Sequence, residues 1–256
     1  MSERKLRVGD FDAVIFDLDG VVTRTASIHA RAWKQVFDRY RERRLQRGEA
    51  GFDPFLIEVD YPRYVDGKPR YDGVRSFLAA RAIVLPEGAG GDALSDETVR
   101  GLGDEKNRLY NELLEEGGVE VFEDTVEQIG RWRGMGLKTA IVSSSKNCAK
   151  VLEAAGLRHL FDVRVDGREA EVMDLEGKPA PDIFVEAARL LGVDPGRGIV
   201  IEDAVAGVRA GRAGGFGHVV GVDRDGRMRE ALLAAGADVV VNDLREIRIE
   251  PARRVR

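Results

Sequence analysis

The feature that most constrains this sequence is a short apolar run at residues 13–16, which ends in two carboxylates, Asp17 and Asp19, and then Gly20. A continuous apolar run near the start of a chain predicts a strand buried on both faces of a parallel sheet. Residues two apart on an extended strand point the same way, so both carboxylates would face one spot. Two carboxylates at such a short distance repel each other unless a cation or a shared proton relieves the repulsion, and Mg²⁺ is the favoured cation. Taken alone, the same residues are also compatible with a simple turn after a strand.

Strand and helix patterns alternate from residue 119 onwards. The predicted strands span residues 137–142, 162–165, 199–201, 219–222 and 238–241. Helices are predicted between them, for example over residues 227–235. Regular alternation of this kind is typical of an α/β fold with a doubly wound parallel sheet.

Residues 25–117 have a different pattern, with helices and loops but no convincing strand. Helices are predicted over residues 27–43, 71–82 and 104–116. The stretch 48–60 is rich in Gly, Asp and Pro, and we interpret it as a loop. We therefore predict an α/β core, residues 1–24 and 118–256, with an all-helical cap domain, residues 25–117, inserted after the first strand. We expect the cap to open and close over the strand ends.

Composition narrows the class of protein further. The chain has 256 residues, 43% hydrophobic residues and a net charge of -5, which is ordinary for a globular protein and gives no sign of a nucleic-acid partner. We interpret the short basic stretch 245–256 as a solvated tail. The single cysteine, Cys148, excludes an intrachain disulfide. No apolar signal region or membrane-length stretch is present, so we expect a cytoplasmic protein with no membrane partner. We also expect a monomer.

Polar residues follow three of the predicted strands, and a lysine precedes one of the helices. These residues are Asp17, Asp19, Ser143, Lys178, Glu202 and Asp203. Functional groups gather beyond the carboxyl ends of strands in open α/β sheets, so we expect these residues to meet at one edge. Acids, a hydroxyl and an ammonium are the groups that phosphoryl transfer through an aspartyl-phosphate requires. A second carboxylate then moves protons on and off the reacting oxygen.

Four motifs in order carry a resemblance to a known family. They are DLDG at 17–20, VSSSKN at 142–147, GKPAPDIF at 177–184 and IEDAVAG at 201–207. With these motifs the chain resembles the haloacid-dehalogenase superfamily, in its β-phosphoglucomutase-like subfamily. The resemblance implies that Asp17 is the nucleophile and Asp19 the general acid/base. It also implies that Ser143 and Lys178 bind the phosphoryl group.

The same resemblance implies a magnesium site. Asp17, the Asp19 carbonyl and Asp203 would bind Mg²⁺, with Glu202 assisting. Asp19 also separates reaction types, because the dehalogenases of the superfamily are not expected to carry this second aspartate. Halide displacement needs no proton donor, whereas departure of an ester oxygen does, so we set dehalogenation aside.

The resemblance extends into the predicted cap. A TAxxHxxAWK-like pattern is matched by Thr25, His29, Trp33 and Lys34. The substrate-binding residues that the resemblance implies are Thr25, His29, Trp33, Arg70, Lys106 of a Lys-Asn pair, Ser145, Lys146 and Asn147. The resemblance implies that Arg70 binds the distal phosphate of a bisphosphate. It implies that Ser145, Lys146 and Asn147 bind the other phosphate. Without the pattern, His29 would be interpreted as a core histidine.

The chain also departs from the family pattern. Arg24 stands where many relatives have an acid, and we expect it to alter the electrostatics of the hinge or surface near the site. The cap has extra residues around 44–66 and 86–102, which would change which sugar fits.

The resemblance implies a Mg²⁺-dependent enzyme that interconverts β-glucose 1-phosphate and glucose 6-phosphate through a bisphosphate. Two alternatives stay open. One is a sugar-phosphate phosphatase on the same scaffold, with water as the acceptor. The other is a non-catalytic sugar-phosphate sensor or partner-binding protein, which the presence of Asp17, Asp19 and Asp203 disfavours.

Overall fold

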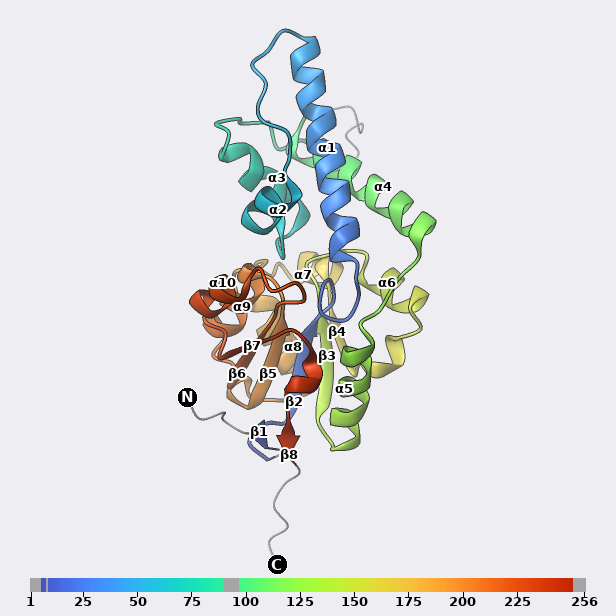
Figure 1. Ribbon diagram of the computed structural model, residues 1–256, viewed down its shortest axis with the longest axis vertical. Helices are drawn as coiled ribbons and strands as arrows, with labels where there is room; N and C mark the ends of the chain where they lie inside the picture. Colours follow the sequence, from blue (N-terminus) through green and yellow to red (C-terminus); the bar gives the residue numbers. More distant parts are fainter. Residues whose placement is uncertain (1–5, 8, 90–96, 251–256) are drawn as a thin grey trace, which may run out of the picture. The chain divides into compact units, whose positions relative to one another are not determined.

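The protein is represented by a computed structural model that describes residues 6–7, 9–89 and 97–250. The chain forms two compact units, shown in Figure 1. The first comprises Met1–Arg24 and Glu120–Arg256, and the second Thr25–Val119. In the described residues no helix combines the length and apolarity needed to cross a membrane.

The first unit contains a six-stranded sheet in which every neighbouring pair is parallel. Its strand order is β4 (Val163–Val165), β3 (Lys138–Val142), β2 (Ala13–Asp17), β5 (Gly198–Glu202), β6 (His218–Val222) and β7 (Val239–Val241). This order confirms the prediction of a doubly wound α/β sheet. All five residues of β2 are buried, as expected for a central strand covered on both faces.

Helices cover both faces of this sheet (Figure 1), and α8 and α9 pack on the same face. The helices are α5 (Glu123–Gly134), α6 (Cys148–Ala154), α7 (Gly167–Val172), α8 (Asp182–Leu191), α9 (Val205–Ala213) and α10 (Arg229–Ala235). Ile15 of β2 packs in one apolar cluster with Phe184 of α8 and Val208 of α9. Its neighbour Phe16 points the other way and stacks on Trp132 of α5, with ring centroids 6.0 Å apart. A small parallel pair, β1 (Leu6–Arg7) and β8 (Ile249–Glu250), completes the unit.

In its described residues the second unit consists of helices and loops, with no strand. It contains α1 (Ala26–Gln46), α2 (Ile57–Asp60), a π-helical turn (Tyr61–Val65), α3 (Arg70–Ala79) and α4 (Val99–Gly117). Its core is aromatic: the Phe37 ring of α1 lies 3.8 Å from that of Phe77 of α3. Trp33 stacks on Phe37 at 5.2 Å, so one stripe of α1 supplies much of this core.

The loop prediction for residues 48–60 is wrong at its end, where α2 forms, and the π-helical turn follows directly. Phe55 and Val65 are buried on either side of this segment. Asp60 accepts hydrogen bonds from Leu56 N at 2.8 Å and Arg81 Nη2 at 2.9 Å, which fixes the first turn. Pro62 lies in the opening positions of the π-helical turn, where a missing N–H costs little. Asp60, one of the polar residues that suggested a loop, therefore stabilises the start of α2 instead.

Candidate active site

The candidate site is built around Asp17, the last residue of β2. The register pairs Asp17 with Val142 of β3 and Phe16 with Ile201 of β5, so the carboxyl ends of three strands lie level. The loop before α8 brings Lys178 to this edge. Its ammonium donates to Asp17 Oδ1, and it also donates to Glu202 Oε1 at 2.5 Å.

All three of these charged side chains are buried, Lys178 at 2%, Asp17 at 6% and Glu202 at 0% exposure. Burial raises the pKa of Asp17 well above its usual value; Lys178 opposes that rise, and the charges of Glu202 and Asp19 add to it. Burial also opposes the charge on Lys178, but its two carboxylate neighbours outweigh that effect and raise its pKa. The cluster is a buried ammonium shared by two carboxylates, with one net negative charge when all three groups are ionised.

Glu202, which is predicted to assist a metal ion, contacts Lys178 and the backbone. Both of its carboxylate oxygens are used within the protein, one by Lys178 and the other by the backbone N–H of Ala204 at 2.8 Å. A Cβ on Gly207 would lie 1.6 Å from Glu202 Oε1, so α9 needs a glycine there to accommodate the carboxylate. Glu202 is thus built to hold Lys178.

Asp203 approaches the turn that follows β2. A Cβ on Gly20 would lie 1.8 Å from Asp203 Oδ2, and Gly20 has a φ of +91°. Gly20 is therefore required both for the turn and for the approach of this carboxylate. Within the described ranges, no three His, Cys, Asp or Glu side chains are grouped so that they could hold a metal ion. Asp17, Asp203 and the main-chain carbonyl of Asp19 stay the predicted oxygen donors for a magnesium ion.

Ser143 connects β3 to the second aspartate. Its hydroxyl donates to Asp19 Oδ2 at 3.1 Å and accepts from the backbone N–H of Ser145 at 3.1 Å. Ser143 is 1% exposed, and its own backbone N–H donates to Val165 O at 3.2 Å. The structure thus brings Ser143, Ser145 and Asp19 together beside the strand ends.

The rest of the 143–147 loop is braced by α7. The Asn147 N–H donates to Ser145 Oγ at 3.2 Å, and Arg168 Nε donates to Lys146 O at 2.9 Å. The Lys146 ammonium lies 2.6 Å from Glu171 Oε2. Lys146 therefore has an acidic partner from α7, which sequence reasoning missed because that helix was not predicted.

In the second unit, three predicted substrate-binding residues meet. Lys106 Nζ lies 2.6 Å from His29 Nδ1 and 5.1 Å from the Trp33 ring centroid. An ammonium can only donate, so His29 Nδ1 accepts and the imidazole proton is on Nε2. Tyr110, which sequence reasoning missed, stacks on His29 at 4.1 Å. Its spacing of four residues from Lys106 on one helix was the available signal.

The other predicted positions in this unit contact different partners. Thr25 is fully buried, and its carbonyl accepts from His29 N at 2.9 Å at the start of α1. Lys34 binds Asp38 at 2.7 Å. Arg70 donates from Nη1 to Asp104 Oδ1 at 3.0 Å.

The departures from the family pattern are also located. Arg24 lies 4.2 Å from the centre of the Phe122 ring and 3.7 Å from a Glu120 carboxylate oxygen, so it packs against the chain that returns into the first unit. The predicted extra residues at 86–102 lie partly outside the described residues.

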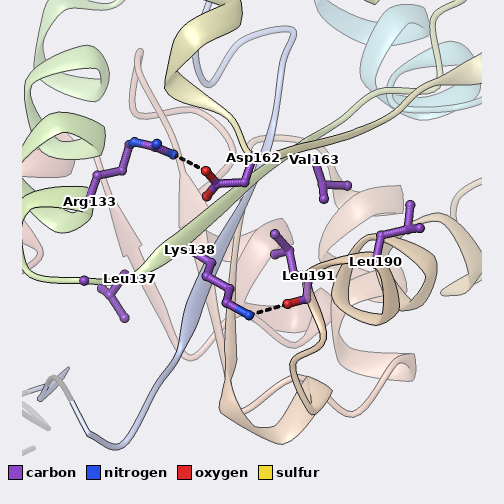
Figure 2. Close-up of a pocket in the computed structure, with 8 residues that line it drawn as sticks. Arg133, Leu137, Lys138, Asp162, Val163, Leu190 and Leu191 are labelled. Carbon is purple, nitrogen blue, oxygen red and sulfur yellow. Dashed lines mark hydrogen bonds and ion pairs between the residues drawn. The ribbon is translucent and has the colours of Figure 1, made fainter.

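A separate cavity of about 520 Å³ lies at the opposite edge of the sheet (Figure 2). It opens beside Lys138, the first residue of β3, whose ammonium donates to Leu191 O at 2.6 Å. Arg133 and Asp162 pair across its rim at 3.0 Å. Its charged lining groups are thus engaged with one another and with the backbone, away from Asp17.

Comparisons with known proteins agree with this geometry. Residues 11–215 match the family model "haloacid dehalogenase-like hydrolase". A β-phosphoglucomutase of Mycobacterium tuberculosis is 49% identical, over 92% of this chain and 90% of the relative. A phosphorylated-carbohydrates phosphatase of Thermotoga maritima is 29% identical, over 92% of this chain and 99% of the relative.

A crystal structure of β-phosphoglucomutase from Clostridium difficile is also similar, with a TM-score of 0.70 and 26% identity. The match covers 93% of each chain. The chain therefore belongs to the haloacid dehalogenase-like hydrolase family, in its β-phosphoglucomutase-like subfamily. As such it is an enzyme, a phosphotransferase or phosphatase.

Proposed function

We propose that this protein is a Mg²⁺-dependent sugar-phosphate mutase that converts β-glucose 1-phosphate into glucose 6-phosphate through a bisphosphate. The observation that carries the proposal is the buried contact of Lys178 with Asp17 at the end of β2. A carboxylate held there beside a fixed ammonium is equipped to accept a phosphoryl group. The 49% identical relative supports the choice of sugar phosphate.

In the proposed first step, a carboxylate oxygen of Asp17 attacks phosphorus. A P–O bond forms to Asp17, and the P–O bond to the sugar oxygen breaks. Asp19, protonated beforehand, gives its proton to the departing oxygen, and the Ser143 hydroxyl that contacts Asp19 holds a phosphoryl oxygen. Phosphorylated Asp17 then passes its phosphate to the 6-hydroxyl of β-glucose 1-phosphate, and Asp19 takes the proton of that hydroxyl. The resulting bisphosphate reorients, returns its other phosphate to Asp17 by the first step, and leaves glucose 6-phosphate.

Lys178 neutralises charge on the phosphoryl oxygens throughout, and Glu202 keeps its ammonium at the reacting carboxylate. This arrangement is fixed before substrate arrives, because both oxygens of Glu202 already have donors. The electrostatic stabilisation therefore costs no rearrangement during the reaction.

The residues at this edge fit a hard cation. Two aspartate carboxylates, Asp17 and Asp203, and the Asp19 carbonyl are oxygen donors of the kind that Mg²⁺ takes, with waters and substrate phosphate completing its shell. When bound, Mg²⁺ would offset the negative charge gathered at the phosphoryl group. Lys178 lies between the two carboxylates of Asp17 and Glu202, so this cluster has one net negative charge when all three groups are ionised, which a cation would offset.

For the helical unit we propose substrate recognition. His29 and Lys106 would contact the sugar, and Arg70 would bind the distal phosphate. Trp33 is 3% exposed and stacked on Phe37, so we assign it to holding Lys106 in place. The loop Ser145–Lys146–Asn147 would bind the other phosphate, once Lys146 exchanges Glu171 for it.

The test is to measure how phosphate partitions. Purified protein, Mg²⁺, β-glucose 1-phosphate and a trace of glucose 1,6-bisphosphate are mixed, and glucose 6-phosphate and free phosphate are followed together. We expect glucose 6-phosphate with little free phosphate, and no product from the Asp17→Asn control. Free phosphate equal to the substrate consumed would contradict the mutase and establish the alternative, a sugar-phosphate phosphatase, which the 29% identical relative keeps open.

A further inference from the structure

Arg70 is held by a partner on another helix of its own unit. It opens α3 directly after Pro69, and its Nη1 donates to Asp104 Oδ1 on α4 at 3.0 Å. The Tyr71 hydroxyl donates to the same oxygen at 2.9 Å. The side chains of Arg70 and Asp104 are only 18% and 32% exposed, so this pair is shielded better than a typical surface ion pair.

The helix that carries Asp104 is shaped to receive these two side chains. The preceding residue, Gly103, lies inside α4, where glycine is intrinsically unfavourable. A Cβ at Gly103 would lie 2.7 Å from Tyr71 Cδ1 and 3.3 Å from Arg70 Cγ. The glycine therefore lets Arg70 and Tyr71 pack directly on α4, where Asp104 can reach both.

The contact leaves Arg70 able to bind an anion. A guanidinium has five N–H donors in a rigid fork, and the Asp104 contact uses one side of it. The guanidinium of Arg100 lies 5.0 Å from the Tyr71 ring centroid and that of Arg70 lies 5.1 Å from it. Two guanidinium groups and one carboxylate leave this cluster with a net positive charge, which suits a phosphate.

We propose that Asp104 is a positioning residue for Arg70, orienting its guanidinium toward the distal phosphate of a bisphosphate. This inference rests on the proposed function of Arg70. Asp104 does not touch the phosphate; it fixes one edge of the fork, and Tyr71 fixes Asp104. The side-chain entropy of a long flexible arginine is thereby lost on folding rather than on binding.

The experiment compares two phosphate esters. Glucose 1,6-bisphosphate has a distal phosphate, and p-nitrophenyl phosphate has none. For Asp104→Ala we expect KM for the bisphosphate to rise about tenfold with kcat nearly unchanged, the loss typical of one charge-assisted contact. Turnover of p-nitrophenyl phosphate should stay within about twofold of wild type. The matched control is Asp72→Ala, which removes an acid paired with Arg75 on the exposed side of α3.

A double-mutant cycle separates positioning from general damage. In an Arg70→Ala background, Asp104→Ala should add little further rise in KM, because its effect passes through Arg70. Equal losses on both esters, additive losses in the cycle, or a lower KM in Asp104→Ala would overturn the inference. The role of Asp104 and the mutase proposal are tested independently. A phosphatase would also remove phosphate from the bisphosphate, and its KM would rise in Asp104→Ala in the same way.

Discussion

At the scale of single residues, Lys178 has the greatest influence on the site, because it is the cation between two buried carboxylates. Removing one partner of a buried ion pair leaves uncompensated charge and typically costs about 3–5 kcal/mol. We therefore expect Lys178→Met to lower the free energy of unfolding by roughly that amount and to abolish turnover.

Urea unfolding and activity assays check this prediction. The matched control is Lys138→Met on the opposite edge of the sheet, where the ammonium contacts only a carbonyl in the described structure. We expect that variant to lose about 1 kcal/mol and to keep its activity. If Lys178→Met were as stable as the control, the burial of the Asp17 and Glu202 carboxylates would not need the lysine charge, which would contradict the prediction.

The sequence predicted Asp17, Lys178 and Ser143 at one edge, since parallel strands deliver their carboxyl ends there. The role of Glu202 could not be predicted in this way. Whether a carboxylate next to Asp203 faces a cation or a lysine depends on its rotamer, and that is set by Gly207 and the Ala204 N–H. Asp104 was missed for a related reason, because its contact joins two helices distant in sequence.

At the scale of elements, α7 braces the 143–147 loop, and its own start depends on Asp166. This residue caps the helix and forms a reciprocal capping box with Glu169. Burial and the nearby Glu169 raise the pKa of Asp166 to about 6. Because the folded state holds this proton more tightly than the unfolded state, Asp166 contributes stability at low pH that is lost as pH rises through about 6.

Asp166→Asn tests this linkage while keeping a good helix cap. As the pH rises from about 4 to about 6 we expect the wild type to lose stability relative to the variant, since Asn does not titrate. The measurement is the urea midpoint of both proteins across that range. Parallel pH profiles for the two proteins would show that Asp166 does not bind a proton in the folded state.

The motif that starts α7 was readable, since an acid followed three residues later by Glu is a helix-start pattern, yet the helix was not predicted. Its six residues, Gly167–Val172, are too few to show an apolar period. The segment 57–60 was misassigned because it ends a stretch rich in Gly, Asp and Pro, a composition that resembles a loop. Long periodic helices such as α1 were predicted well, because one buried aromatic stripe determines them.

At the scale of the whole molecule, the chain consists of an α/β unit and a helical unit, and the insertion begins directly after the first central strand. Order of motifs and strand alternation made the α/β fold predictable. The motion of the helical unit stays a prediction, since it depends on two linkers rather than on a pattern within either unit.

The central claim is that Asp17 carries the transferred phosphate. The most direct measurement is to mix the protein with Mg²⁺ and glucose 1,6-bisphosphate, quench with acid, and locate the phosphate by peptide mass spectrometry. We predict that the peptide containing Asp17 gains the mass of one phosphate, and that fragmentation places the phosphate on Asp17. This added mass should be absent from Asp17→Asn and from samples in which the metal is chelated. Phosphate on another residue, or turnover retained by Asp17→Asn, would contradict the account.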